Sequence, residues 1–542
     1  MNIAWRLKKQ AEIQPQKIAV KFPKRSYGGQ YQYSSITFQE LDHESDKLAY
    51  QLLKKGAKRG DRVLLFMRPS LHFHAMVFAL YKARLVPVMI DPGMGRKNLL
   101  NCIKQCKPTV MIAESEVQLA RKLFSKSFEN ICLSISTGKF KFGADYSMIE
   151  LLHGETGAVD FEQTPDDELA AILFTSGGTG APKGVLYTHG IFDRQTSMLQ
   201  ELFSLTPSDV DIPGFPLFSL FTLAMGLTSV IPDMDPRHPA QCNPEALVKN
   251  ILDNKATFIA GSPAIWERVA DFCVSHHLTL PTVKYVVMFG APVRSELHEK
   301  FQRILTLGDT YTPYGATECL PVSLANGKAL LRETKEKSQK GHGTCIGLPV
   351  PGVQVKIIKA TDEEISNLDK IEELKSGEIG EIIVTGPTVT PGYDGNDKAT
   401  LLAKIQSNSG LWHRMGDVGY LDEKGELWFC GRKGHVYRDS TQVKYSIPTE
   451  AIYNNHPEVL RSALIKYANS PALVVQLKNP KSYSCDRREQ IKKELIAQAQ
   501  NFDHTKNIKT IFYAKSFPVD VRHNIKIDRQ KLGQMATEGK LL

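Results

Sequence analysis

Short apolar runs typical of strands alternate with helical patterns through the N-terminal half of this 542-residue chain. Arg62 to Met67 is strand-like, Ser70 to Lys82 is helix-like, and Val86 to Ile90 is strand-like again. The same cycle recurs at residues 109–113, 169–174 and 257–260, the last before a helical pattern that begins at Pro263. Alternation of this kind favours mostly parallel sheets covered by helices, because parallel strands need long crossover connections. We therefore predict an α/β fold.

The pattern changes toward the C-terminus, and a chain of this length is expected to divide into domains. From about residue 343 to residue 431 helices become rare and glycine-bounded strands dominate, which predicts a small β-barrel-like unit at the end of an N-terminal domain spanning 1–431. A compact α+β module is predicted over 436–542, with its clearest helix from Asp486 to Ala499. Residues 335–340 are charged and polar and are predicted to form a loop.

A turn rich in glycine and hydroxyl groups directly follows the apolar strand 169–174. Its residues are Thr175, Ser176, Gly177, Gly178, Thr179 and Gly180, with Lys183 after a proline. Glycines let a backbone approach phosphate groups and direct N–H groups toward them, while the hydroxyls add donors and Lys183 adds a positive charge. The lysine precedes glycine rather than serine or threonine, so this is not the common nucleotide P-loop. A flexible linker is the alternative, but the preceding strand and the Pro-Lys-Gly sequence argue against it.

This turn resembles the phosphate-binding loop of the adenylate-forming superfamily, which includes acyl-CoA synthetases, nonribosomal adenylation domains and firefly luciferase. Further matching motifs follow in the superfamily's order: Gly290-Ala291-Pro292, Tyr314-Gly315-Ala316-Thr317-Glu318, His413 to Asp417, Gly431-Arg432, and Arg522 to Asp528. Each motif alone has an ordinary structural explanation, since a lone aspartate is usually a turn residue and a lone lysine a solvated charge. Together and in order they indicate nucleotide-dependent activation of an acid.

The resemblance also implies a role for each matching residue. In the superfamily the aromatic residue at Tyr314 stacks on adenine, Thr317 touches the α-phosphate, and Glu318 holds Mg²⁺, an ion that prefers hard oxygen ligands. The backbone of 290–292 borders the adenine, and Asp417 accepts the ribose hydroxyls.

The superfamily also closes its site with a mobile C-terminal lid. Arg432 closes on the ribose side, and a hinge, here residues 432–435, lets the lid carry the catalytic Lys526 in and out. The predicted cofactors are therefore ATP and Mg²⁺. The chemistry crowds anions together, so Lys526, Mg²⁺ and the glycine-rich turn are expected to act by charge neutralisation and positioning.

Several residues depart from the pattern of common acyl-CoA synthetases. Gly434 occupies the hinge position, and the stretch 436–450 contains no glycine, although thioester-forming relatives have one beside the pantetheine channel. Ser219 replaces a histidine beside the acyl pocket, and Ile525 replaces the glycine before the catalytic lysine. These departures, with Arg522-His-Asn and Ile90 to Arg96, resemble the β-lactone synthetases of bacterial long-chain olefin biosynthesis.

That branch uses ATP to close 2-alkyl-3-hydroxy fatty acids to β-lactones, releasing AMP and pyrophosphate. The alternatives are a medium- or long-chain acyl-CoA synthetase, for which CoA would be a further cofactor, or an acyl-AMP ligase. A non-catalytic nucleotide-binding protein is a third alternative, disfavoured because Lys183, Glu318, Asp417, Arg432 and Lys526 are all present.

An uncharged run from Ile212 to Pro232 is long enough to span a bilayer. Prolines and glycines interrupt it, so a buried helix lining an acyl pocket is the better interpretation. We predict an apolar substrate pocket formed by Phe218, Ser219, Phe221, Gly261 and Trp266, with ordinary core packing as the alternative.

The bulk composition limits the partners. A formal net charge of +10 favours anionic ligands, yet no nucleic-acid-binding motif is present. The nine cysteines are scattered, and the N-terminus lacks the apolar core of a signal peptide, so we expect free thiols in the cytoplasm. The predicted partner is a small fatty or hydroxy fatty acid. Loose peripheral association with a membrane and contact with other enzymes of a lipid pathway are further hypotheses.

Overall fold

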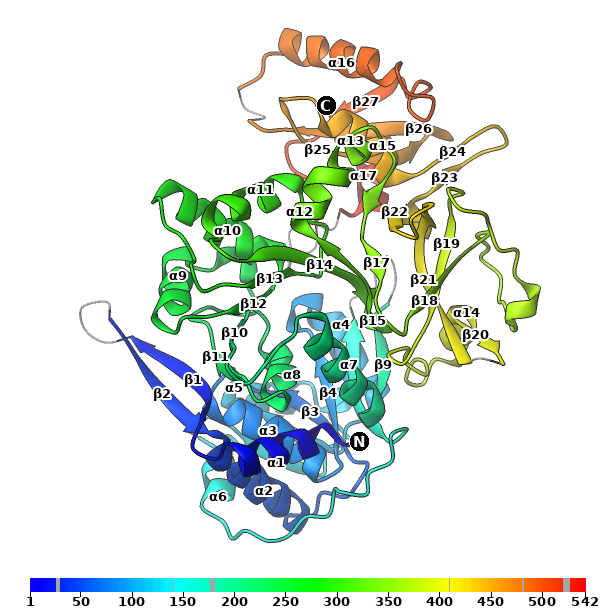
Figure 1. Cartoon of the computed structure of the whole chain (residues 1–542). Helices are drawn as coiled ribbons and strands as arrows, with labels where there is room; N and C mark the ends of the chain where they lie inside the picture. The colour runs from blue at the N-terminus through cyan, green and yellow to red at the C-terminus, as the bar shows by residue number, and fades with distance from the viewer. Residues whose placement is uncertain (26–29, 139, 176–180, 409, 480–481, 520–526) are drawn as a thin grey trace.

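The computed structural model describes residues 1–25, 30–138, 140–175, 181–408, 410–479, 482–519 and 527–542. The chain forms two large sheets with helices packed on them, a smaller antiparallel sheet and a C-terminal α+β unit, which lies at the top of Figure 1 in orange and red. This arrangement confirms the predicted α/β fold class, the β-rich unit included.

A seven-stranded sheet contains the phosphate-loop motif, with the strand order β7-β6-β5-β3-β4-β8-β9. All neighbours are parallel except β8 and β9, which form an antiparallel pair. The strands are β3 (Arg62–Phe66), β4 (Val86–Ile90), β5 (Val110–Ala113), β6 (Leu133–Ser136), β7 (Tyr146–Ser147), β8 (Leu169–Thr175) and β9 (Lys183–Thr188). The crossover helices are α3 (Leu71–Lys82), α4 (Arg96–Cys106) and α5 (Ser115–Leu123), and α3 packs with α1 (Ile3–Ile13) and α2 (Phe38–Lys54); α6 (Met148–Leu152) follows β7.

A nine-stranded sheet has the order β17-β15-β14-β13-β12-β10-β11-β1-β2. Its strands are β1 (Ile18–Arg25), β2 (Tyr31–Thr37), β10 (Val210–Pro213), β11 (Thr228–Val230), β12 (Phe258–Gly261), β13 (Tyr285–Met288), β14 (Asp309–Ala316), β15 (Cys319–Asn326) and β17 (Leu348–Pro349). Its helices are α7 (His189–Leu202), α8 (Ser219–Ala224), α9 (Pro244–Asp253), α10 (Pro263–Ser275) and α11 (Ser295–Ile304). Apolar side chains of α9, α10 and α11, among them Ile251, Trp266 and Phe301, form the core against β12 and β13.

The β-rich unit is a six-stranded antiparallel sheet. Its strands are β16 (Thr344–Cys345), β18 (Gln354–Ile358), β19 (Gly380–Thr385), β20 (Lys404–Ser407), β21 (Gly410–Leu421) and β22 (Leu427–Arg432), and α14 (Asp397–Ala403) precedes β20. The long strand β21 pairs with β19, β20 and β22, so residues from distant parts of the sequence meet along it.

The C-terminal unit packs helices on both faces of a three-stranded sheet, β25 (Val459–Tyr467), β26 (Ser470–Leu477) and β27 (Thr510–Tyr513). Successive side chains of a strand point to opposite faces of the sheet. Leu473 and Val475 pack with α16 (Cys485–Ala499), whereas Val474 packs with α17 (Arg529–Thr537). The unit begins with the hairpin β23 (Tyr437–Arg438) and β24 (Val443–Lys444), followed by α15 (Ser446–Asn454).

Two local predictions are wrong. The charged segment 335–340 is not a loop, because Lys335–Gln339 forms the short helix α13, where Lys340 pairs with Glu336 one helical turn earlier. The run 212–232 is not one helix, because prolines divide it into the end of β10, a 3₁₀ turn (Pro216–Phe218), α8 and β11. Within the described part of the chain, no helix is long and apolar enough to cross a membrane.

Candidate active site

A large cavity of about 2390 Å³ is lined by residues from both large sheets, the antiparallel sheet and the C-terminal unit. Small-molecule pockets commonly enclose roughly 300–1,000 Å³. The cavity therefore has room for more than one small-molecule ligand.

The matching motifs come together along this cavity. The residues that line it are Lys183, Gly290, Ala291, Pro292, Tyr314, Gly315, Ala316, Thr317, Glu318, Asp417 and Arg432. Thr175 ends β8 and pairs with Lys183 in the β8–β9 ladder, which brackets the glycine-rich turn. Residues 176–180 and Lys526 lie outside the described residues.

The positions of these motifs follow from the sheet topology. Residues 290–292 directly follow β13, and 314–318 extend from the end of β14 into the turn toward β15. Because β13 and β14 are parallel neighbours, their carboxyl ends meet at one edge, where ligands of open α/β sheets bind. The rings of Tyr314 and Phe429 have centroids 6.2 Å apart, so the motif 314–318 borders the antiparallel sheet.

Asp417 is held between two partners. The Tyr314 hydroxyl donates to its Oδ2 at 2.6 Å, and Arg432 Nη1 lies 3.0 Å from its Oδ1. Asp417 and Arg432 are direct cross-strand partners on β21 and β22. Burial, together with the Asp417 charge, raises the pKa of Tyr314 well above its ordinary value, and Asp417 raises that of Arg432. The carboxylate of Asp417 is therefore held in one orientation by a hydroxyl donor and a guanidinium.

Glu318 is oriented by a residue that sequence reasoning missed. The Tyr393 hydroxyl donates to Glu318 Oε1 at 2.7 Å, and Lys183 Nζ lies 4.8 Å from the centroid of the same ring. Tyr393 thus contacts both Glu318 and Lys183. Pro391-Gly392 marks a turn before it, but no sequence signal points its hydroxyl at Glu318.

Lys404, also missed, adds a buried positive charge near the same carboxylate. It lies on β20, and burial lowers its pKa to about 8, whereas the Glu318 charge acts in the opposite direction. Backbone contacts hold this region together, since Thr390 N donates to the Glu318 carbonyl at 2.9 Å and the Tyr187 hydroxyl donates to the Thr317 carbonyl at 2.6 Å. The carboxylate of Glu318 lines the cavity and could hold a divalent cation.

The apolar end of the cavity has an aromatic wall. Phe218 and Phe221 line it together with Phe215, Phe192 and Phe289, and the Phe218 and Phe289 centroids are 4.5 Å apart. The α8 segment provides part of this wall although it is shorter than the helix predicted there.

The other three predicted pocket residues lie behind the wall. Ser219 is fully buried, donates to the Pro216 carbonyl and lies 2.5 Å from His74 Nε2. Trp266 is fully buried in the core of the nine-stranded sheet, and Gly261 lets β12 approach that core closely. For these residues the core-packing alternative fits the structure better than direct contact with substrate.

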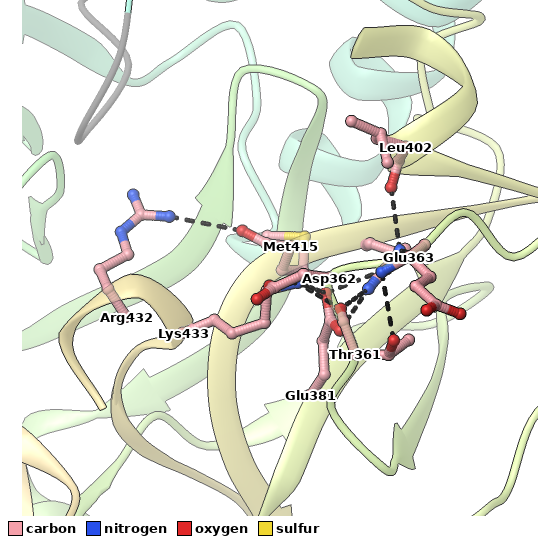
Figure 2. Close-up of polar contacts among 9 residues, drawn as sticks. Thr361, Asp362, Glu363, Glu381, Leu402, Met415, Arg432 and Lys433 are labelled. Atoms are coloured by element: carbon pink, nitrogen blue, oxygen red, sulfur yellow. Dashed lines mark hydrogen bonds and ion pairs between the residues drawn. The ribbon is translucent and has the colours of Figure 1, made fainter. Parts of the chain in front are cut away.

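Residues 432–434 lead into the C-terminal unit, and Lys433 holds this link to the antiparallel sheet unit. In Figure 2 Lys433 extends into a polar cluster, where its Nζ donates to the Thr361 carbonyl at 2.6 Å and lies 3.5 Å from Glu381 Oε1. Arg432 lies apart from this cluster and donates to the Met415 carbonyl at 3.3 Å. Gly434 follows, and a side chain there would meet nothing within 4 Å.

Comparison with known proteins identifies the family. The sequence matches the AMP-binding enzyme family over residues 7–394. The chain belongs to this family. The olefin beta-lactone synthetase of Xanthomonas campestris pv. campestris is 38% identical over 100% of this chain and 98% of its own length. The corresponding synthetase of Stenotrophomonas maltophilia is 36% identical over 99% of this chain and 98% of its own length. The crystal structure of ATP-bound MatB from Rhodopseudomonas palustris has the same fold, with a TM-score of 0.78, 20% identity and 99% of each chain covered.

This AMP-binding enzyme is an ATP-dependent adenylate-forming ligase, which confirms the activity class inferred from the sequence. The two residues that flank the segment 520–526, Val519 and Ile527, line the cavity and face each other across an antiparallel bridge. The C-terminal unit therefore contributes directly to the wall of the site.

Proposed function

We propose that this enzyme uses ATP to close a 2-alkyl-3-hydroxy fatty acid to a β-lactone, with release of AMP and pyrophosphate. The observation that carries the proposal is full-length identity of 36–38% to two olefin beta-lactone synthetases. The cavity supports it, because an aromatic, apolar end suited to alkyl chains adjoins the end that carries the nucleotide motifs.

The reaction balances with no thiol. One substrate oxygen attacks the α-phosphorus of ATP, the bond to pyrophosphate breaks, and a substrate–AMP ester forms. The second substrate oxygen then displaces AMP: a hydroxyl attacks the acyl carbon and loses its proton, or a carboxylate attacks C3 and breaks the C3–O bond. Either order forms one C–O bond within the ring, and enforced proximity of the two groups offsets ring strain.

Residues of the cavity have matching roles in this proposal. Asp417, fixed by Tyr314 and Arg432, binds the ribose hydroxyls. Lys183 contacts the phosphates, and Glu318, oriented by Tyr393, fits a Mg²⁺ ion because that ion prefers carboxylate oxygens. When bound, Mg²⁺ supplies neutralisation of the developing phosphate charge.

The C-terminal unit, residues 436–542, is proposed to be a lid that turns about 432–435. Lys433 is anchored by Thr361 and Glu381, while a Cβ at Gly434 would meet nothing within 4 Å, so rotation is expected to begin at Gly434. The lid would deliver Lys526 to the reacting phosphorus. Removal of one such charge typically costs about 10²–10³ in rate, so Lys526→Ala should lose AMP formation by that factor and retain ATP binding.

AMP release tests the function directly. The enzyme is incubated with ATP and Mg²⁺, and with either a 2-alkyl-3-hydroxy acid alone or a fatty acid plus CoA. The proposal expects AMP from the hydroxy acid without any thiol. AMP that appears only when CoA is present would instead identify an acyl-CoA synthetase.

A further inference from the structure

Large apolar side chains are exposed together on one part of the seven-stranded sheet unit. Phe140 and Phe142, on the connection from β6 to β7, are 66% and 50% exposed, and Leu119 and Leu123 on α5 are 52% and 76% exposed. The two phenylalanine rings touch, with centroids 5.8 Å apart. Every other phenylalanine of the 24 in the chain is buried or half-buried. We call these four side chains the apolar patch.

The loop and the helix form one surface. The two leucines are one helical turn apart and lie on the same side of α5 as Ser115. Ser115 Oγ donates to the Phe140 carbonyl at 2.8 Å, and Arg121 Nη2 donates to the Gly143 carbonyl at 3.2 Å. Hydrogen bonds at both ends therefore fix the loop alongside the helix, which brings the two rings and the two leucines to the same part of the surface.

Basic side chains border the apolar patch. Lys122 and Lys126 are exposed at the end of α5 and just beyond it, and Lys141 stands between the two phenylalanines. Lys141 is paired with Glu150 at 2.7 Å, and Glu129 and Asp145 lie around the same small hollow as Lys122. Exposed rings and leucines beside lysines are the composition of surfaces that lie in the interface of an anionic membrane.

We infer that the apolar patch docks on the surface of a lipid bilayer that contains anionic lipids. The rings enter the boundary between headgroups and acyl chains, and the lysines contact the headgroups while their stems lie along apolar surface. This location would place the large cavity close to the bilayer. Glu114 and Val117, at the start of the same helical segment, line the large cavity, and Val117 is about 9 Å along the helix axis from Leu123. A ligand with an alkyl chain would have a short path from bilayer to cavity.

Vesicle sedimentation with the full-length enzyme, in the absence of substrate, tests the docking. We expect binding to vesicles of phosphatidylcholine and phosphatidylglycerol, and weaker binding to phosphatidylcholine alone. The Phe140→Ser/Phe142→Ser variant should lower the partition coefficient at least about tenfold, because two aromatic side chains no longer leave water. Lys122→Glu/Lys126→Glu should weaken binding to the anionic vesicles about tenfold or more, an effect that added salt abolishes.

Leu307→Ser is the matched control, since Leu307 is 79% exposed between α11 and β14, outside the patch. It should bind vesicles like the wild type, and circular dichroism should show unchanged folding in all variants. Wild-type protein that does not sediment with anionic vesicles would overturn the inference, as would equal binding by the double phenylalanine variant. Self-association that this variant abolishes, with no vesicle binding, would assign the patch to a second copy of the chain and would equally refute lipid docking.

Discussion

Tyr393→Phe removes one hydroxyl group and keeps the ring that Lys183 contacts. The lost interaction is the 2.7 Å hydrogen bond to Glu318 Oε1. A hydrogen bond to a charged group contributes about 1.5–3 kcal/mol. Glu318 lines the cavity, so water can replace the donor, and we take the lower end, about 1.5 kcal/mol. This corresponds to a loss of about tenfold in affinity for the Mg²⁺ that Glu318 is proposed to hold.

The assay is AMP release at saturating ATP and hydroxy acid with Mg²⁺ varied. The apparent Mg²⁺ constant should rise about tenfold, while the ATP KM at saturating Mg²⁺ should change less than about twofold, because the Lys183 contact remains. Tyr420→Phe is the matched control: its hydroxyl donates to the His342 carbonyl, away from Glu318. An unchanged Mg²⁺ dependence in Tyr393→Phe, or the same shift in Tyr420→Phe, would refute the reasoning.

Three further substitutions test the packing around the site. Glu381→Gln leaves the buried Arg414 without its 2.7 Å ion pair and should lower the free energy of unfolding by about 3–5 kcal/mol in urea titrations; an unchanged midpoint would contradict this. Burial lowers the pKa of His74 to about 4. Between about pH 6.5 and pH 4 the imidazole is therefore protonated in the unfolded chain but neutral in the folded chain. The free energy of unfolding falls as the pH drops through this range. His74→Gln should reduce this slope by about 1.4 kcal/mol per pH unit, seen as a flatter dependence of the urea midpoint on pH. Gly431→Ala should lower the thermal midpoint, because Gly431 has φ +131° and a Cβ would lie 2.2 Å from Ser446 Oγ. An unchanged midpoint would contradict this expectation.

Sequence periodicity predicted the sheet core well. The expected strand Val86 to Ile90 is β4 to the residue, and the helix expected from Asp486 begins one residue earlier in α16. Continuous apolar runs of this kind belong to strands buried on both faces, where burial dominates other preferences. The helix α13 was missed because its residues are polar, although the Glu336–Lys340 spacing carries a helical signal.

The sequence predicted a common site for the motifs, and their described residues line one cavity, but the interactions among them could not be predicted. Sequence reasoning named Asp417 and Glu318 as separate binding residues. Only the fold shows that the Tyr314 hydroxyl donates to Asp417 and that the Tyr393 hydroxyl donates to Glu318. Ser219 illustrates a second limit of sequence reasoning. Its neighbours Phe218 and Phe221 line the cavity, but on a helix consecutive residues point in different directions, and Ser219 turns into the core toward His74.

The mass of the product tests the central claim most directly. A 2-alkyl-3-hydroxy fatty acid is incubated with enzyme, ATP and Mg²⁺ in the absence of CoA, and the organic product is analysed by mass spectrometry with the Lys526→Ala variant in parallel. The account predicts a neutral product lighter than the substrate by one water, formed together with AMP and about 10²–10³-fold more slowly in the variant. Unchanged hydroxy acid, or a thioester formed only after CoA is added, would contradict it.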